Sequence, residues 1–408
     1  MPFRGERYRA TERLSALIAP PYDVITPEQR GRYAAWDSHN IVHIMLPEAM
    51  SHEDRYARAA ALLAEWRAQG VLVTDAEPSV YVLSQEYQPP GGPARTRLGV
   101  FAAVAAEPYE TGRVKPHEKT HAGPKADRLA LLRTTRTNLE SIFLIAPDAD
   151  GALAAELAGI AKTAPTTRAE LDGVRIKLWV VGGGAASRIS HLSSLSSLYI
   201  ADGHHRYETA VAYAQENPAA DRVLALIVSA RDKGLTILPT HRLIFGPGRD
   251  PQALLERWRR FFDVGSLAPG ADPVAGLAQL GARGTACLVV TRDGPAVTLV
   301  LKSDAPLDAV PGLSPSPAVR ALDVAVVEEL VVKEILGLDT STPTLTYTPD
   351  AREALPAVSR GSATCAVLLN PPTVEQVFAV ADAGEVMPQK STYFIPKVPS
   401  GLVLRPLG

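Results

Sequence analysis

The sequence predicts an α+β protein, because short strand-like segments and longer helix-like segments follow one another along its 408 residues. Short, largely apolar runs bounded by turn residues are typical of buried strands, and they occur at residues 80–83, 98–102, 140–145, 176–181, 198–201, 223–228, 235–238, 286–291 and 296–301. Apolar residues at helical spacing predict helices at residues 53–69, 127–136, 252–262, 324–336 and 374–381. The sequence changes character around residues 246–251, where we expect a domain boundary.

Breaker residues delimit these segments. Prolines stiffen residues 18–25 into an extended stretch, and the first predicted helix stops at Gly70. A proline-rich loop at residues 89–93 joins the first two strands. Pro124 lies near the start of the helix at 127–136, and a glycine- and serine-rich connection leads into the strand at 198–201.

Composition argues against several classes of protein. The formal net charge is −2, so no global basic field indicates a nucleic-acid partner. Cys287 and Cys365 lie in apolar runs, which predicts buried thiols in a reducing compartment. Residues 1–13 are charged and contain no signal-peptide core, and no apolar run approaches the roughly 18 residues of a membrane span. A soluble, cytoplasmic protein without a membrane partner is expected.

The segment around residues 198–210 predicts a buried strand, a tight turn and a helix. We expect Asp202 to cap the helix and Gly203 to allow the turn. A helix N-terminus suits a phosphate, and arginine and histidine side chains add donors for one. A capped surface helix with incidental polar residues is the alternative. The groups expected to bind phosphate are Asp202, Gly203, His204, His205 and Arg206.

Residues 117–121 match H-E-x-x-H, which builds a zinc site only where both histidines share one face of a helix. Pro116 before the motif and Gly123-Pro124 after it argue against such a helix. The loop instead presents Glu118, a carboxylate that can act as a general base on a substrate hydroxyl. A solvated charged loop is the alternative.

Two further polar clusters are each consistent with a functional site and with an ordinary surface segment. Lys390, Ser391 and Thr392 offer one cation and two hydroxyls on a loop, and Thr240, His241 and Arg242 lie at a strand end. Together with Glu118 and the histidines, they supply the groups that phosphoryl transfer needs. The chain has neither a phosphate loop of the G-x-x-x-x-G-K-[ST] type nor the protein-kinase signatures.

Three of these segments resemble motifs of known kinases. The D-G-H-H-R at residues 202–206 is similar to that of the free-serine kinases in the ParB/sulfiredoxin-like superfamily. The P-H-E at residues 116–118 resembles that of the archaeal ADP-dependent serine kinase, whose glutamate is the catalytic base. Residues 383–392 look like that kinase's C-terminal G-E-V-x-x-P-K-T-T loop, with Gln389 inserted between proline and lysine.

More closely, the chain is identified as a member of the DUF1015 family. The segments that carry this resemblance cover both halves in order, at residues 19–25, 117–120, 201–210, 238–242 and 388–394. The resemblance implies an N-terminal extension at 1–105 packed on the core, a ParB/sulfiredoxin-like nucleotide-binding catalytic core at 106–246, and a C-terminal α/β domain at 247–408 that closes the active site.

The resemblance also implies a small-molecule kinase that phosphorylates free L-serine with ATP or ADP. Glu118 would be the base, Asp202 a Mg²⁺ ligand, and residues 390–392 would complete the phosphate or amino-acid contacts. The implied substrate contacts are His117, Thr120, Thr240, His241 and Arg242. Two other functions stay open: a nucleotide-dependent regulatory protein of the ParB-like type, and a zinc hydrolase that uses His117, His121 and either His204 or His205.

Overall fold

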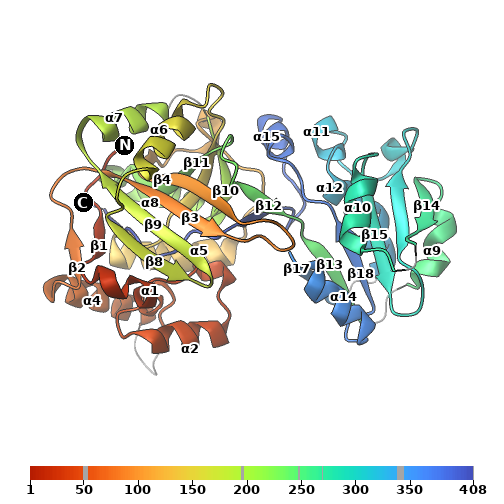
Figure 1. Cartoon of the computed structure of the whole chain (residues 1–408), viewed down its shortest axis with the longest axis horizontal. Coiled ribbons are helices and arrows are strands. Elements are labelled where there is room, and N and C mark those ends of the chain that lie inside the picture. Colours follow the sequence, from red (N-terminus) through yellow and green to blue (C-terminus); the bar gives the residue numbers. More distant parts are fainter. Residues whose placement is uncertain (49–53, 194–196, 247–248, 269, 338–343, 408) are drawn as a thin grey trace. The chain divides into compact units, whose positions relative to one another are not determined.

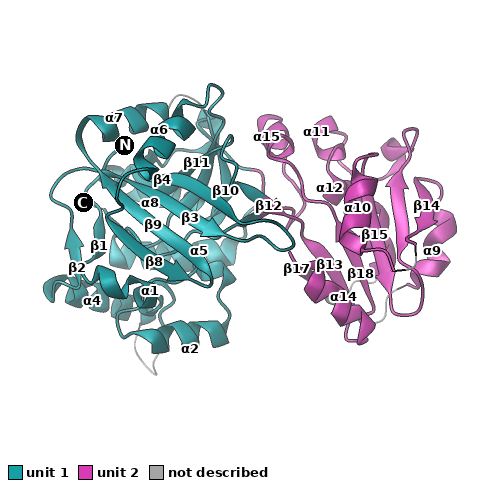
Figure 2. Cartoon of the chain, viewed as in Figure 1, with its two compact units in different colours: residues 1–116, 120–236, 394–408 teal, residues 117–119, 237–393 magenta. Residues whose placement is uncertain are grey.

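The structure is a computed structural model that describes residues 1–48, 54–193, 197–246, 249–268, 270–337 and 344–407 (Figure 1). Its helices and sheets confirm the predicted α+β class. The chain forms two compact units (Figure 2): unit 1 contains Met1–Pro116, Thr120–Thr236 and Phe394–Gly408, and unit 2 contains His117–Lys119 and Ile237–Tyr393. Among the described helices, none is long and apolar enough to cross a membrane.

The units differ from the predicted division of the chain. Strands β3 (Val80–Tyr87) and β4 (Arg95–Ala105) are interior strands of the main sheet of unit 1, so residues 1–105 do not form a separate layer on the core. The chain leaves unit 1 within β12 (Thr236–Leu238) and returns to it within β19 (Tyr393–Ile395). Residues 247–248 of the expected boundary lie outside the described residues.

The main sheet of unit 1 has the strand order β5-β10-β7-β11-β4-β3-β9-β8. β5 with β10 and β7 with β11 are parallel pairs, and the other neighbours are antiparallel. β11 lies between two strands and is buried along most of its length, which accounts for its unbroken apolar sequence. The remaining strands of this sheet are β5 (Val114–Lys115), β7 (Ile142–Ala146), β8 (Thr167–Leu171), β9 (Val174–Val181), β10 (Leu198–Asp202) and β11 (Arg222–Ser229).

Helices complete the core of unit 1. Leu157 of α6, Ile189 of α7 and Tyr207 of α8 pack in one buried cluster with strand residues such as Leu144. The helices are α1 (Leu14–Leu17), α2 (Pro27–Trp36), α3 (Val42–Met45), α4 (Arg55–Ala68), α5 (Ala122–Thr135), α6 (Ala152–Ala161), α7 (Gly183–Leu192) and α8 (His204–Glu216). Short antiparallel pairs join β1 (Glu6–Tyr8) to β2 (Leu72–Thr74) and β6 (Thr137–Asn138) to β20 (Arg405–Pro406).

Unit 2 contains an antiparallel sheet of order β14-β16-β15-β18-β13-β17. The segment predicted as one helix at 324–336 contains a π-helical turn, Glu328–Val332, between α12 and α13. The strands are β13 (His241–Phe245), β14 (Phe262–Ser266), β15 (Ala286–Thr291), β16 (Val297–Leu301), β17 (Thr344–Thr348) and β18 (Cys365–Leu369). The helices are α9 (Pro251–Trp258), α10 (Pro273–Gly281), α11 (Pro317–Arg320), α12 (Asp323–Val327), α13 (Lys333–Leu336), α14 (Ala351–Ser359) and α15 (Val374–Asp382).

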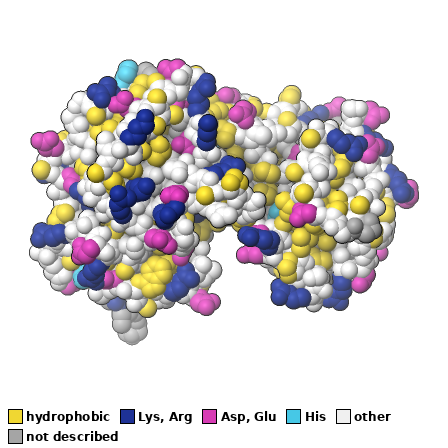
Figure 3. All heavy atoms as spheres, in the orientation of Figure 1, with side chains coloured by type: hydrophobic (Ala, Val, Ile, Leu, Met, Phe, Trp, Pro, Cys, Tyr) yellow, Lys and Arg dark blue, Asp and Glu magenta, His cyan; other side chains and the backbone are white. Residues whose placement is uncertain are grey.

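The buried thiols predicted from the sequence are present in the structure. Cys287 in β15 and Cys365 in β18 are free and buried, as their apolar surroundings in the sequence predict. Basic and acidic side chains are interspersed on the face shown in Figure 3, and the formal net charge is −2.

Candidate functional site

The predicted strand, turn and helix are present in unit 1, and the turn depends on a glycine. β10 ends at Asp202 and α8 begins at His204. Gly203 has a φ of 94°, which side chains other than glycine rarely adopt, and a Cβ there would lie 3.1 Å from the guanidinium carbon of Arg206. Gly203 is also the N-cap residue, without a capping side chain. The expectation that Asp202 caps the helix is therefore wrong.

Asp202 is held between two cations instead. Its Oδ1 accepts a hydrogen bond from Nζ of Lys397 at 2.9 Å, and its Oδ2 accepts one from Arg206 at 2.5 Å. Burial favours a raised pKa, but the charges of Lys397 and Arg206 outweigh burial and lower the pKa of Asp202. Each oxygen of Asp202 thus already pairs with a cation of the protein, and its role as a Mg²⁺ ligand stays a prediction.

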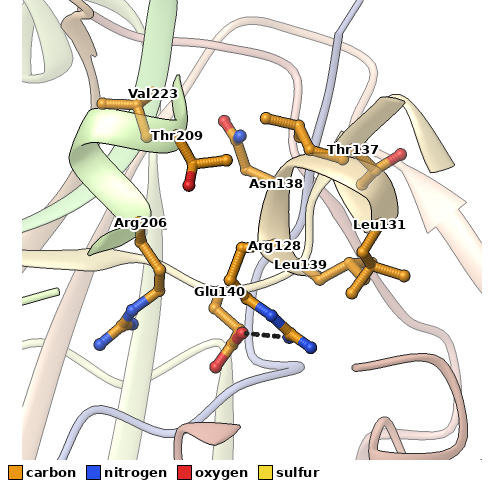
Figure 4. Close-up of a pocket in the computed structure, with 10 residues that line it drawn as sticks. Arg128, Leu131, Thr137, Asn138, Leu139, Glu140, Arg206, Thr209 and Val223 are labelled. Atoms are coloured by element: carbon orange, nitrogen blue, oxygen red, sulfur yellow. Dashed lines mark ion pairs between the residues drawn. The ribbon is translucent and has the colours of Figure 1, made fainter. Parts of the chain in front are cut away.

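The guanidinium of Arg206 points into unit 1 and anchors the turn. Besides Asp202, it donates to the carbonyl oxygen of Ser141, and its side chain is only 9% exposed. Burial lowers the pKa of Arg206, but Asp202 and Glu140 raise it above its ordinary value. In Figure 4, Arg206 and Arg128 lie on opposite sides of Glu140, which is 3.6 Å from Arg128. Arg206 thus anchors the turn, and its direct contact with phosphate stays a prediction.

A cavity of about 50 Å³ lies beside this cluster (Figure 4). Nε of Arg206 and Oγ1 of Thr209 are buried at its lining without hydrogen-bond partners in the described part of the chain. A volume of this size holds a few water molecules, which would satisfy both atoms.

The first turns of α8 also hold the segment that leads into α5. The backbone N–H of His121 donates to Nε2 of His205 at 2.9 Å. Burial, and then the neighbouring His121, lower the pKa of His205, so its ring is neutral at pH 7. Glu208 accepts hydrogen bonds from Thr120 at 2.7 Å and from Lys125 at 2.8 Å. Thr120, predicted to contact substrate, is engaged with Glu208.

Replacing Glu208 by glutamine is expected to loosen this segment, because the amide loses the ion pair with Lys125. Amide hydrogen exchange should rise at residues 120–125, while stability should fall by no more than about 1 kcal/mol because the pair is partly exposed. Glu216→Gln, which removes an exposed ion pair with Arg133 from the same helix, is the matched control. Unchanged exchange at residues 120–125 in the Glu208 variant would contradict this role.

Unit 2 brings together two predicted motifs that lie far apart in the chain. The backbone N–H of Lys390 donates to Oε1 of Glu118 at 3.4 Å, across 272 residues. Nε2 of His117 lies 3.1 Å from the hydroxyl oxygen of Thr392, and the N–H of Met387 donates to the carbonyl oxygen of His117 at 2.8 Å. Glu118 is therefore fixed against the loop that carries a lysine and two hydroxyls.

Internal hydrogen bonding shapes this loop. Lys390 has a φ of 54°, in the left-handed region. The hydroxyl of Ser391 donates to the carbonyl oxygen of Pro388 at 2.5 Å, and Ser391 is buried. Ser391, predicted to bind phosphate, closes the turn that presents Lys390.

The predicted triplet at residues 240–242 divides into two roles. Arg242 is 1% exposed and pairs with Glu328 at 3.2 Å. One guanidinium nitrogen of Arg242 and the hydroxyl of Thr240 are buried without hydrogen-bond partners among the described residues, and such donors usually require a ligand or water. His241 differs, because its Nδ1 accepts from the N–H of Leu369 at 3.2 Å. Burial, and then Arg242, lower the pKa of His241 to about 4, so its ring is neutral at pH 7, and its contact with substrate stays a prediction.

The zinc interpretation fails on geometry. Residues 117–121 are not helical, so His117 and His121 do not share a helix face. Over the part of the chain that the structure describes, no group of three or more His, Cys, Asp or Glu side chains is arranged to hold a metal ion.

Sequence reasoning missed three residues of these clusters. Lys397 pairs with Asp202 from 195 positions away, and no local pattern indicates that contact. Glu208 was detectable, since it lies three residues after His205 on the same helix face. Glu328, the partner of Arg242, lies in a π-helical turn that an apolar periodicity does not reveal.

No curated protein matches the chain. Among solved structures, a free serine kinase in complex with AMP is 15% identical, with 73% of this chain and 87% of that one covered and a TM-score of 0.38. A conserved hypothetical protein from Pyrococcus furiosus is 14% identical, with 74% and 93% covered and a TM-score of 0.38. SbnI with C-terminal truncation from Staphylococcus aureus is 12% identical, with 75% and 87% covered and a TM-score of 0.40.

Family membership rests on the sequence. A family model described as "Protein of unknown function (DUF1015)" matches residues 1–325. That match covers both the Glu118 segment and the strand, turn and helix at Asp202, and it extends from unit 1 into unit 2. The chain belongs to the DUF1015 family.

Proposed function

We propose that this protein is a kinase that transfers a phosphoryl group from ATP or ADP to the hydroxyl group of a small molecule, with free L-serine as the first acceptor to test. The observation that carries the proposal is the hydrogen bond between Lys390 and Glu118, which unites two motifs that resemble those of free-serine kinases. The ParB/sulfiredoxin-like assignment of the core is part of the same proposal.

Glu118 is proposed as the general base. Its carboxylate accepts the proton of the acceptor hydroxyl, the hydroxyl oxygen bonds to the terminal phosphorus of the donor, and the shortened nucleotide leaves. The backbone N–H of Lys390 contacts this carboxylate, and the ammonium group of the same residue is proposed to offset charge on the transferred group. The buried donors of Arg242 and Thr240 offer further unfilled hydrogen-bonding capacity.

The N-terminus of α8 is proposed to hold the donor phosphates. The first N–H groups of a helix have no partner within it, and the helix dipole favours an anion there. Asp202, Arg206 and Lys397 carry a combined charge of about +1 at neutral pH, which also favours an anion. The proposal routes no step through a metal ion.

The peptide chain itself connects the two clusters. Thr120 follows Glu118 by two residues, and its hydroxyl donates a hydrogen bond to Glu208 of α8. The proposal assigns the base to one cluster and the phosphate contacts to the other.

A screen of acceptors tests the proposal. The full chain, with ATP or ADP and Mg²⁺, is incubated with L-serine, L-threonine, L-homoserine and glycerol, and products are followed by ³¹P NMR. A phosphomonoester that forms only when acceptor and nucleotide are both present is expected. Nucleotide hydrolysis without any phosphomonoester would reject the kinase and favour a nucleotide-dependent regulatory protein.

A further inference from the structure

A pocket of about 290 Å³ lies within unit 2, and sequence neighbours of Glu118 and Lys390 line it. Lys119, the residue after Glu118, lines it, as does Gln389, the residue before Lys390. The N–H of Met387 donates to the carbonyl oxygen of His117, so the loop that forms one wall is fixed to the segment of the proposed base. The pocket is lined by Lys119, Gly312, Leu313, Ser314, Val319, Ala325, Glu329, Val386, Met387, Pro388 and Gln389.

The pocket carries one positive and one negative side chain in a mostly apolar lining. Lys119 supplies an ammonium group and Glu329 a carboxylate. The side chain of Glu329 is 17% exposed, and its ion-pair partner Lys333, at 2.6 Å, is 55% exposed. Solvent screens a pair of this kind, so Glu329 retains capacity for a second cation.

The carboxylate of Glu329 lies against Gly312. A Cβ on Gly312 would lie 2.0 Å from Oε2 of Glu329, so the carboxylate occupies space that only glycine leaves open. Glu329 also lies in the π-helical turn Glu328–Val332, and such turns are frequent at functional sites. The two neighbouring carboxylates of this turn have different partners, because Glu328 pairs with Arg242.

We infer that this pocket holds the charged head of a free α-amino acid, with Lys119 binding the carboxylate and Glu329 binding the ammonium group. The inference rests on the proposed function and assigns the acceptor to a chemical class, the zwitterionic hydroxy amino acids. The pocket is at the small end of the roughly 300–1,000 Å³ typical of ligand sites, which suits a free amino acid. A serine within a peptide lacks both charges, so it would not be an acceptor.

Calorimetry with the full chain and no nucleotide tests the inference. The probes are L-serine, ethanolamine, which lacks the carboxylate, and glycerate, which lacks the ammonium group. Lys119→Met is expected to weaken serine about 10–100-fold and to leave ethanolamine unchanged. Glu329→Gln is expected to weaken serine similarly and to leave glycerate unchanged. Lys302→Met, at another lysine of unit 2, is the control and should change none of them.

The pattern across ligands decides the outcome. Equal losses for all three ligands, or no loss in either variant, would overturn the assignment of the pocket. Gly312→Ala gives an independent check, because displacement of the Glu329 carboxylate should weaken serine and ethanolamine but not glycerate. Binding is measured without nucleotide, so the expected pattern of affinity losses can hold while phosphoryl transfer fails. That outcome would reject the proposed kinase activity and keep the pocket assignment. Phosphoryl transfer without the expected pattern would reject only the pocket assignment.

Discussion

Replacing Glu118 by glutamine is expected to lower turnover about 10²–10⁴-fold while nucleotide affinity stays close to that of the wild type. Glutamine keeps the shape of the side chain and the oxygen that accepts from Lys390 at 3.4 Å, but it cannot take up the hydroxyl proton. The loss should therefore fall on kcat. Steady-state rates with the best acceptor from the screen, together with nucleotide titrations by calorimetry, measure both quantities.

The control for this variant is Glu110→Gln, an exposed glutamate in the same region of the sequence. It should leave both turnover and nucleotide affinity unchanged. Near-normal turnover in Glu118→Gln would remove Glu118 from the mechanism. A parallel loss of nucleotide affinity would show that Glu118 acts on the donor and not as the base for the acceptor.

Replacing Asp202 by asparagine is expected to lower the free energy of unfolding by about 3–5 kcal/mol at pH 7, because two cations lose their shared carboxylate. The side chains of Asp202, Arg206 and Lys397 are 18%, 9% and 17% exposed, so water screens these charges poorly. Equilibrium denaturation in urea measures the difference. Asp221→Asn, which removes a pair with Arg222 from a carboxylate that is 60% exposed, should cost at most about 1 kcal/mol.

We also expect the stability difference between the wild type and Asp202→Asn to depend on pH, and its sign follows from the pKa of Asp202. The pKa of Asp202 in the folded protein lies below its unfolded value of about 3.9, so its stabilising contribution is complete well above that pH. The contribution is lost as the pH falls through that range toward the folded pKa. The difference between wild type and Asp202→Asn should be constant from about pH 5 to 8 and should shrink below about pH 4, by up to about 1.4 kcal/mol per pH unit. A difference that persists undiminished at about pH 3 would contradict the ion-pair arrangement.

The structure also changes what Arg206 can be expected to do. The guanidinium of Arg206 already donates hydrogen bonds to Ser141 and Asp202. Arg206→Lys should therefore disturb the turn at Gly203 as well as any bound phosphate. Both Arg206→Lys and Arg206→Ala are expected to weaken nucleotide binding, with lysine intermediate. Calorimetry measures the affinities, and unchanged binding in both variants would place the phosphates elsewhere.

Local patterns in the sequence determined the α+β class. They also determined the order of strand β10, the turn at Gly203 and helix α8. Both depend on residues that are neighbours in the chain: an apolar run, a glycine with φ of 94° and the first turn of a helix. Pro116 was an equally local signal and correctly argued against a helical zinc motif at residues 117–121. Gly123 and Pro124 do not break a helix, because both lie in the first turn of α5. Glu118 and Lys390 were also singled out by residue type, and the resemblance to known motifs gave them roles, but the sequence did not show that they touch.

Only the tertiary structure decided the partners of the charged residues. Asp202 does not cap α8, because Lys397 from the C-terminal tail and Arg206 take its two oxygens. Nδ1 of His241 accepts a hydrogen bond from the N–H of Leu369, which lies in the neighbouring strand β18. Hydrophobic periodicity reports which face of an element is buried, but an ion pair between residues 195 positions apart depends on how distant segments fold together. For that reason the chain's local elements were predictable from its sequence, whereas the roles of its buried charges were not.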